Sequence, residues 1–158
     1  MPRLRVCIDA CFLIALYDRG DQHHEIASRH FVSLFEGELS EGNVLVAPWP
    51  ILYESLGTRQ VKDHRASQRL ELILGRLRPQ GRLHLLDDSN YRESALTHHL
   101  ANRRKLSLVD RVLRAMIEET KPHFDVLLTY NTKDFQDSCA VRRMTLINED
   151  VEDAAALL

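Results

Sequence analysis

Short apolar runs that alternate with helix-like segments are the feature of this sequence that most constrains its fold. The runs have the length and residue types of buried strands and lie at 4–8, 44–47, 83–86, 125–129 and 144–147. The helix-like segments lie at 11–17, 24–39, just after Pro50, 63–77, 89–103 and from Ser107 to Pro122. This alternation predicts an α/β fold, with a parallel sheet covered by helices on both faces.

Length and composition indicate one soluble domain. A chain of 158 residues fits a single domain, which we expect to span 1–158. The hydrophobic content of 44% and charged content of 28% exclude wholesale disorder. No apolar run approaches the roughly 20 residues of a membrane helix. The N-terminus does not look like a secretory signal. The three cysteines are an odd number and contain no CxxC pair, which makes a disulfide framework improbable. We therefore expect a cytoplasmic protein with reduced, structural cysteines.

The ends of the predicted strands carry polar residues. Asp9 ends the first strand and Asn131 lies just past the fourth. Ligand sites in such sheets lie at the carboxyl ends of the strands, where the strand order reverses. We therefore expect these two residues to lie near each other, with Asp134 in the same loop.

Familiar catalytic motifs are missing from the chain. It contains no GxGxxG, GxxxxGK or GxSxG pattern, and Ser28 stands where an HExxH motif would need its second histidine. The paired histidines His23, His24, His98 and His99 are best interpreted as surface or boundary residues, because adjacent helical positions point about 100° apart and cannot easily share one metal. The lone Trp49 either packs the loop before the next helix or stacks a base.

Carboxylates in unusual positions remain as candidate site residues. Asp9 follows a buried run, Glu54 lies between apolar neighbours, and Asp110 lies in the first turn of an apolar helix. Carboxylates gathered in one cleft repel one another unless a cation neutralises them, and Mg²⁺ or Mn²⁺ prefers such oxygen ligands. A metal held there can activate water for phosphoryl displacement.

Each acid also has a structural interpretation. Ser107 and Asp110 have the spacing of a capping box, Glu54 suits an exposed helix position, and Asp9 suits a helix N-cap. Spacing alone leaves both interpretations open.

Five segments resemble the PIN-domain nucleases, and in particular VapC-like members. They occur in the family's order and read VCIDACFLIAL at 6–16, DQHHEIA at 21–27, PILYES at 50–55, LSLVD at 106–110 and LLTYNTKDF at 127–135.

The resemblance implies an α/β/α sandwich with a central, mostly parallel sheet of four to five strands, and a divalent-metal-dependent endoribonuclease. It makes Asp9, Glu54 and Asp110 the catalytic acids, which would hold Mg²⁺ or Mn²⁺ together with Asn131 and Asp134. Asn131 stands where many members have a fourth aspartate, and Cys11 stands where a small polar residue is common. Ser107 and Thr129 are expected to orient the acids. The family further implies an antitoxin protein as partner, and a homodimer.

Basic residues surround the expected acidic site, although the net charge of the chain is −2. Segment 58–82 has seven Lys or Arg against two acids, segment 103–114 has five against one, and the tail from Met144 has four acids and no Lys or Arg. We expect the RNA backbone to be contacted by Arg59, Lys62, Arg111 and Arg114.

Two other functions remain open. A phosphoryl enzyme with Asp9 as nucleophile would need a second aspartate at position 11, where Cys11 stands. A catalytically degenerate PIN-like module that binds RNA or protein is favoured by Asn131.

Overall fold

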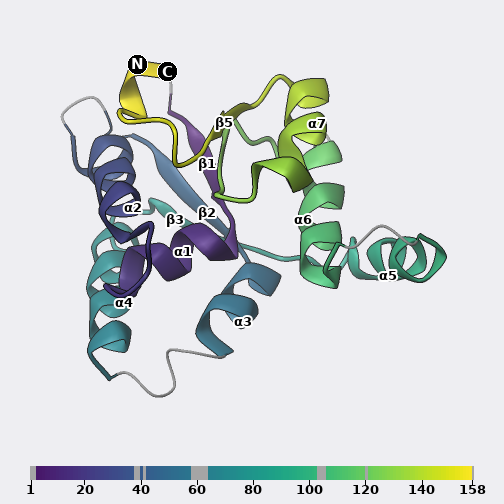
Figure 1. Ribbon diagram of the computed structural model, residues 1–158, viewed down its shortest axis with the longest axis horizontal. Helices are drawn as coiled ribbons and strands as arrows, with labels where there is room; N and C mark the ends of the chain where they lie inside the picture. The colour runs from purple at the N-terminus through teal and green to yellow at the C-terminus, as the bar shows by residue number, and fades with distance from the viewer. Residues whose placement is uncertain are drawn as a thin grey trace.

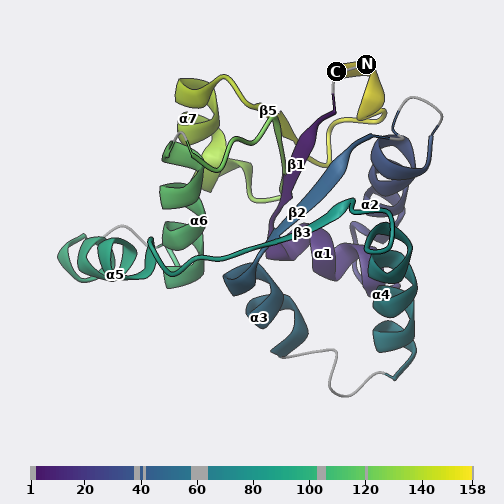
Figure 2. The same cartoon turned by 180° about the vertical axis from the view of Figure 1, so that it is seen from behind.

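The protein was analysed as a computed structural model, which describes residues 3–37, 40, 42–57, 64–102, 106–119 and 121–157. Five strands form one parallel sheet in the order β3-β2-β1-β4-β5. Their bounds are β1 Arg5–Ile8, β2 Val44–Pro48, β3 Leu83–Leu86, β4 Val126–Leu128 and β5 Thr145–Ile147. Strands that are consecutive in the sequence are joined through helices, and these helices cover both faces of the sheet (Figures 1 and 2). The predicted α/β/α sandwich with a parallel sheet is confirmed.

The helices divide into two layers. The first packs one face of the sheet and contains α1 (Ala10–Tyr17), α2 (His24–Phe31), the π-helical segment η1 (Val32–Glu36) and α4 (His64–Leu77). The second packs the other face and contains α5 (Arg92–Ala101), α6 (Leu108–Glu118) and α7 (Thr132–Arg142). Helix α3 (Trp49–Gly57) follows β2 directly, and a short 3₁₀ turn, η4 (Ala155–Leu157), lies near the C-terminus. None of the described helices combines the length and apolar character needed to span a membrane.

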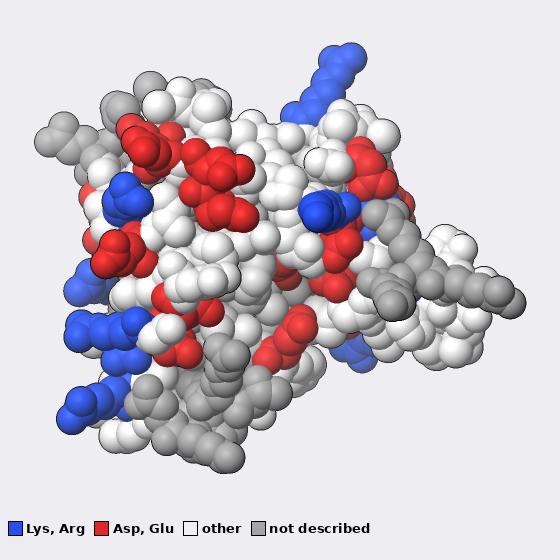
Figure 3. Space-filling model, viewed as in Figure 1, with Lys and Arg blue, Asp and Glu red and all other residues white. Residues whose placement is uncertain are grey.

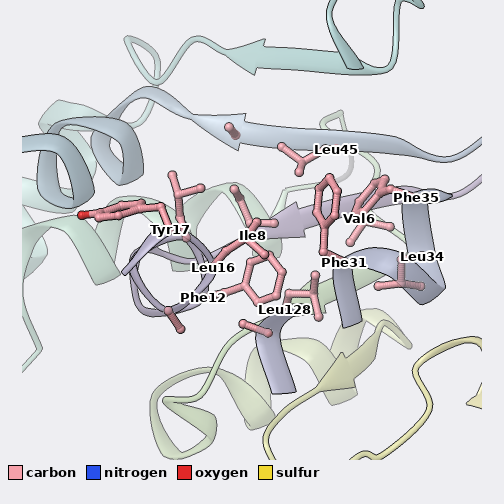
Figure 4. Packing of buried hydrophobic residues seen from close by; sticks show 14 of the residues in the cluster. Val6, Ile8, Phe12, Leu16, Tyr17, Phe31, Leu34, Phe35, Leu45 and Leu128 are labelled. Atoms are coloured by element: carbon pink, nitrogen blue, oxygen red, sulfur yellow. The ribbon is translucent and has the colours of Figure 1, made fainter. Parts of the chain in front are cut away.

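Alternating side chains of the central strands form two apolar cores. Val6 and Ile8 of β1 face the first layer, whereas Cys7 between them faces the second. Figure 4 shows the first core, where the rings of Phe12, Phe31 and Phe35 surround the side chains of the sheet. The strand β1 is buried on both faces, and Asp9 directly follows its last residue, Ile8.

Three sequence predictions differ from the observed elements. The segment predicted as one helix over 24–39 is α2 followed by η1, and 38 and 39 lie outside the described residues. The helix predicted over 89–103 extends only over Arg92–Ala101, because a turn from Asp88 to Tyr91 precedes it and Asn102 is its C-cap, and 103 lies outside the described residues. Asn131 and Asp134 were expected in a loop, but Asn131 is the N-cap of α7 and Asp134 lies in its first turn.

Candidate active site

Asp9 lies where the central strand β1 meets helix α1. Its side chain is buried, and its Oδ1 accepts a hydrogen bond from the backbone N–H of Ala10 at 2.6 Å. Its Oδ2 accepts from the Thr129 hydroxyl at 2.8 Å and from the Cys11 thiol at 3.1 Å. Burial raises the pKa of Asp9 above its usual value and Asp110 adds to this, whereas the three donors act in the opposite direction. Asp9 is therefore both a helix N-cap and a strongly held carboxylate at the sheet edge.

Thr129 and Cys11 join the ends of two neighbouring strands. Cys7 of β1 pairs with Leu127 of β4, so Thr129 follows β4 beside Asp9. The backbone N–H of Asn131 donates to the Thr129 hydroxyl at 3.0 Å, and that of Tyr130 donates to the Cys11 sulfur at 3.2 Å. The expected proximity of Asp9 and the 131 region is thus confirmed, and it results from the reversal of strand order between β1 and β4.

Glu54 lies on α3 and Asp110 in the first turn of α6, and these two helices contact each other. Glu54 is exposed on α3, as one interpretation of the sequence expected, and its pKa is raised by partial desolvation of the carboxyl group, then by Asp110 and by Asp9. Asp110 likewise raises the pKa of Asp9. The charge of Asp110 thus acts on the pKa of both other acids.

Asp110 is a capping-box residue and is also a candidate site residue. The Ser107 hydroxyl accepts from the Asp110 N–H at 3.0 Å and the Ser107 N–H donates to Asp110 Oδ2 at 3.3 Å, which forms a capping box at the start of α6. The Ser107 hydroxyl also donates to Asp110 Oδ2 at 2.7 Å. These bonds orient the carboxylate while the residue stays half-buried beside the site.

Helix α3, which carries Glu54, is held to α1 by a hydrogen bond from Tyr17, a residue that the sequence did not single out. The Tyr17 hydroxyl at the end of α1 donates to the Ser55 carbonyl in a buried hydrogen bond, and the Ser55 hydroxyl donates to the Ile51 carbonyl at 2.6 Å. Tyr17 was indistinguishable in the sequence from the other apolar positions of its helix. Its role follows only from the packing of α1 against α3.

Asn131 and Asp134 form a pair at the start of α7. The Asn131 side-chain amide donates to Asp134 Oδ2 at 2.5 Å, and the Asp134 N–H donates to the Asn131 carbonyl at 3.2 Å. The two side chains therefore contact each other, next to Thr129. Whether they reach a metal stays a prediction.

The donor set suits a hard divalent cation, because it consists of carboxylates, two of which have a pKa raised by a neighbouring acid. In the described part of the chain, no three His, Cys, Asp or Glu side chains are already arranged closely enough to hold a metal ion. A cation would therefore have to draw Glu54 and Asp110 closer to Asp9.

The two basic residues of α6 have partners within the protein. The Arg114 guanidinium binds Asp137 at 2.7 Å, Glu118 at 3.3 Å and the Asp134 carbonyl, and it lowers the pKa of Asp137 to about 2. Arg111 is buried and donates to His99 Nδ1 at 3.1 Å. The positions of both side chains are explained by these contacts within the protein. Their contact with an RNA phosphate stays a prediction. Arg59 and Lys62 lie outside the described residues.

Surface charge is unevenly distributed on the face that Figure 3 shows. Acidic side chains are spread across this face, whereas Lys and Arg lie mainly along the left margin, where α2 and α4 lie, with others towards the right. Part of the basic excess predicted for 58–82 is neutralised or used internally, since Arg76 pairs with Glu36 and Arg82 donates to carbonyls of Asn43 and Phe35.

Comparison with solved structures places the fold. A structure of VapC20 from Mycobacterium tuberculosis, described as a Sarcin-Ricin loop cleaving toxin, matches with a TM-score of 0.56 and 20% identity over 77% of this chain and 86% of that one. A chain of VapBC2 from Rickettsia felis, solved bound to a DNA fragment from their promoter, matches with a TM-score of 0.54 and 14% identity over 92% of this chain and 98% of that one. No protein-family model and no curated protein matches the sequence.

Both solved structures contain VapC-type proteins, and the match extends over most of each chain. The five-stranded parallel sheet with helices on both faces agrees with what the PIN-domain resemblance implied. The fold of this chain is therefore the PIN-like α/β/α fold of the VapC proteins.

Proposed function

We propose that the protein is a divalent-metal-dependent endoribonuclease that hydrolyses RNA phosphodiester bonds, and that it is the toxin of a type II toxin–antitoxin pair. It would act as one PIN-like nuclease domain over 1–158. The observation that carries the proposal is the position of Asp9 at the carboxyl end of the central strand, where Asp110 raises its pKa and both acids raise that of Glu54. Fold similarity to a Sarcin-Ricin loop cleaving toxin supports RNA as the substrate.

Asp9, Glu54 and Asp110 would hold Mg²⁺ or Mn²⁺, with Asn131 and Asp134 as further oxygen donors nearby. When bound, such an ion supplies a water nucleophile near neutral pH and stabilises negative charge on the phosphate. The residues of this chain position the donors. Thr129 and Cys11 hold the Asp9 carboxylate through Oδ2, and Ser107 holds Asp110.

The decisive experiment incubates the purified protein with structured and unstructured RNA, with Mn²⁺ and with a chelator. Cleavage should require the metal and should be lost in Asp9→Asn, which keeps the shape of the side chain but removes its charge. Equal cleavage by wild type and Asp9→Asn would refute the proposal, because a contaminating nuclease would then explain it.

A catalytically degenerate binding module is the second candidate, favoured by the neutral Asn131 beside Asp134. Calorimetric titration with Mn²⁺ separates the two functions. Binding of the metal supports the nuclease, whereas its absence together with RNA binding supports the module.

The partner proteins also belong to the proposal. Similarity to a chain of VapBC2 supports an antitoxin protein as partner. A homodimer follows from the family resemblance alone, and light scattering of the purified protein would measure its mass.

A further inference from the structure

Helix α3, which carries Glu54, is supported by the rest of the protein on one side. Its buried side is formed by Ile51, Leu52 and Ser55, whereas Tyr53 on the opposite side is 69% exposed. The apolar contacts of Ile51 and Leu52 hold the helix against the core, but such contacts have no preferred direction. The orientation of α3, and with it that of Glu54, therefore depends on directional contacts.

Tyr17 of α1 supplies a contact of this kind. It is the last residue of α1, and its side chain is buried. Figure 4 shows its ring at the margin of the first core, with the hydroxyl oxygen pointing away from the other labelled side chains. That hydroxyl donates a buried hydrogen bond to the Ser55 carbonyl, and helices α1 and α3 contact each other. The bond therefore joins the end of α1 to the last turn of α3.

The Ser55 carbonyl is a group that α3 cannot satisfy by itself. Ser55 is one of the last four residues of the helix, which ends at Gly57, and an α-helix leaves the carbonyls of these residues without an internal partner. Ser55 is completely buried, so bulk water does not reach this carbonyl. The Ser55 hydroxyl donates to the Ile51 carbonyl, one turn earlier. Tyr17 therefore caps the end of α3 at the residue next to Glu54.

Tyr17 is itself held in place from two directions. Arg69 of α4 donates from its Nε to the Tyr17 carbonyl at 2.7 Å. The Tyr17 ring packs within the first core, and the N–H of the following residue, Asp18, donates to the Ile14 carbonyl at 2.8 Å. Because both the backbone and the ring are fixed, the hydroxyl group is a fixed point to which the end of α3 is attached.

We propose that Tyr17 is a positioning residue of the metal site, which keeps the Glu54 carboxylate within reach of a cation by capping α3 at Ser55. The proposal rests on the proposed function and adds to it a residue that acts through the helix. Among the described residues, the acids are not yet close enough together to hold a cation, so binding has to draw Glu54 toward Asp9. A loosely held α3 would add conformational freedom that metal binding must then remove.

Tyr17→Phe is the direct test, because it removes the hydroxyl group and keeps the ring. In a calorimetric titration, Mn²⁺ should bind this variant about 10-fold more weakly than the wild type, the lower end of the range for residues that orient metal ligands. Tyr91→Phe is the matched control, since it removes a hydroxyl that donates to Glu119 at 3.0 Å, next to α5. This control should bind Mn²⁺ like the wild type.

A combination with Glu54→Gln separates positioning from a general loss of structure. If Tyr17 acts through the Glu54 carboxylate, adding Tyr17→Phe to Glu54→Gln should weaken Mn²⁺ binding further by less than about 2-fold, because the group that Tyr17 positions is no longer charged. An equal loss of about 10-fold in both backgrounds would overturn the proposal, because Tyr17 would then support the fold as a whole.

Hydrogen exchange in chelator tests the same role without metal. The amides of Trp49–Gly57 should exchange faster in Tyr17→Phe than in the wild type, whereas those of Leu108–Glu118 in α6 should exchange alike in both. Unchanged exchange over α3, or equal acceleration in α3 and α6, would overturn the proposal.

The titration of the wild type distinguishes failure of this proposal from failure of the proposed function. A wild type that binds no Mn²⁺ would refute the metal-dependent function, and the positioning role with it. A wild type that binds Mn²⁺ with the same affinity as Tyr17→Phe would refute the positioning role alone.

Discussion

The Asp9 carboxylate experiences opposing influences on its protonation. Burial and the charge of Asp110 favour the neutral form, whereas the donors Ala10, Cys11 and Thr129 favour the ionised form. Burial is the larger influence, so the pKa lies above its usual value. In the metal-free protein, an ionised Asp9 therefore destabilises the fold, as expected for a carboxylate that is arranged to meet a cation.

Asp9→Asn should make the metal-free protein more stable at neutral pH. Since the pKa of Asp9 is raised from 3.8 in the folded state, its stabilising contribution is complete below that value and is lost as the pH rises through the folded pKa. Asparagine does not ionise, so the difference in free energy of unfolding should grow between pH 4 and pH 7, to the order of 1 kcal/mol. Urea unfolding in chelator at the two pH values measures it. An equal effect of the substitution at both would contradict the raised pKa.

Thr129→Val should weaken Mn²⁺ binding without altering the fold. Valine has nearly the same shape as threonine but cannot donate to Asp9 Oδ2, and loss of such an orienting partner typically weakens metal affinity about 10- to 100-fold. Calorimetric titration is the measurement, with Thr97→Val on the exposed side of α5 as the matched control. Equal Mn²⁺ affinity in the two variants would show that Thr129 does not orient Asp9.

At the scale of elements, α6 links a stable helix start to a site residue. Its first turn is closed by the capping box of Ser107 and Asp110, and its apolar stripe packs Val112, Leu113 and Met116 into the second core. The same hydrogen bonds that begin the helix aim the Asp110 carboxylate. Local helix stability and site geometry therefore depend on one hydroxyl group.

Ser107→Ala should destabilise the protein by about 1 kcal/mol, because the N-cap bond to the Asp110 N–H is lost. Thermal or chemical unfolding measures the change, and Ser94→Ala, at an exposed interior position of α5, should be close to neutral. If both variants unfold alike, the capping box contributes nothing to stability.

The strongest local patterns in the sequence predicted their elements correctly. All five strands lie where apolar runs occur, and α6 begins where its Ser107 signal stands. Helix α7 was missed because it buries few apolar side chains, mainly Phe135 and Cys139, and leaves Val141 exposed. Such a helix shows no apolar stripe, and its packing on α6 through Arg114 and Asp137 is visible only in three dimensions.

The sequence predicted the nearness of residues that lie at strand ends. It did not predict which basic side chains form ion pairs within the protein. Asp9 and Thr129 were brought together by the sheet topology that the sequence implied. A count of basic residues along a segment cannot say which cations already have acidic partners. Arg114 illustrates this, since its partner Asp137 lies 23 positions away.

At the scale of the whole molecule, binding of a metal by the acids is linked to the stability of the fold that holds them in place. A cation that neutralises Asp9, Glu54 and Asp110 should stabilise the entire fold, because it binds the folded chain alone. With Mn²⁺ at about 100 times its dissociation constant, the gain is about 2.7 kcal/mol.

Thermal unfolding with and without Mn²⁺ should show this as a rise in Tm in the wild type. Asp9→Asn should lose the rise, while Leu100→Ala, at an exposed apolar residue of α5, should retain it. An identical rise in Asp9→Asn would place the ion elsewhere on the protein.

The hydrogen bond from Thr129 to Asp9 also determines when the site comes into existence. The two residues are separated by 120 positions, whereas β1, β2 and β3 lie within the first 86 residues and can pair among themselves. During synthesis on a ribosome, the N-terminal half-sheet is therefore available well before β4 has been made. Asp9 stays without its Thr129 donor until nearly the whole chain has emerged, so a nascent chain carries the first acid of the site but not the assembled site.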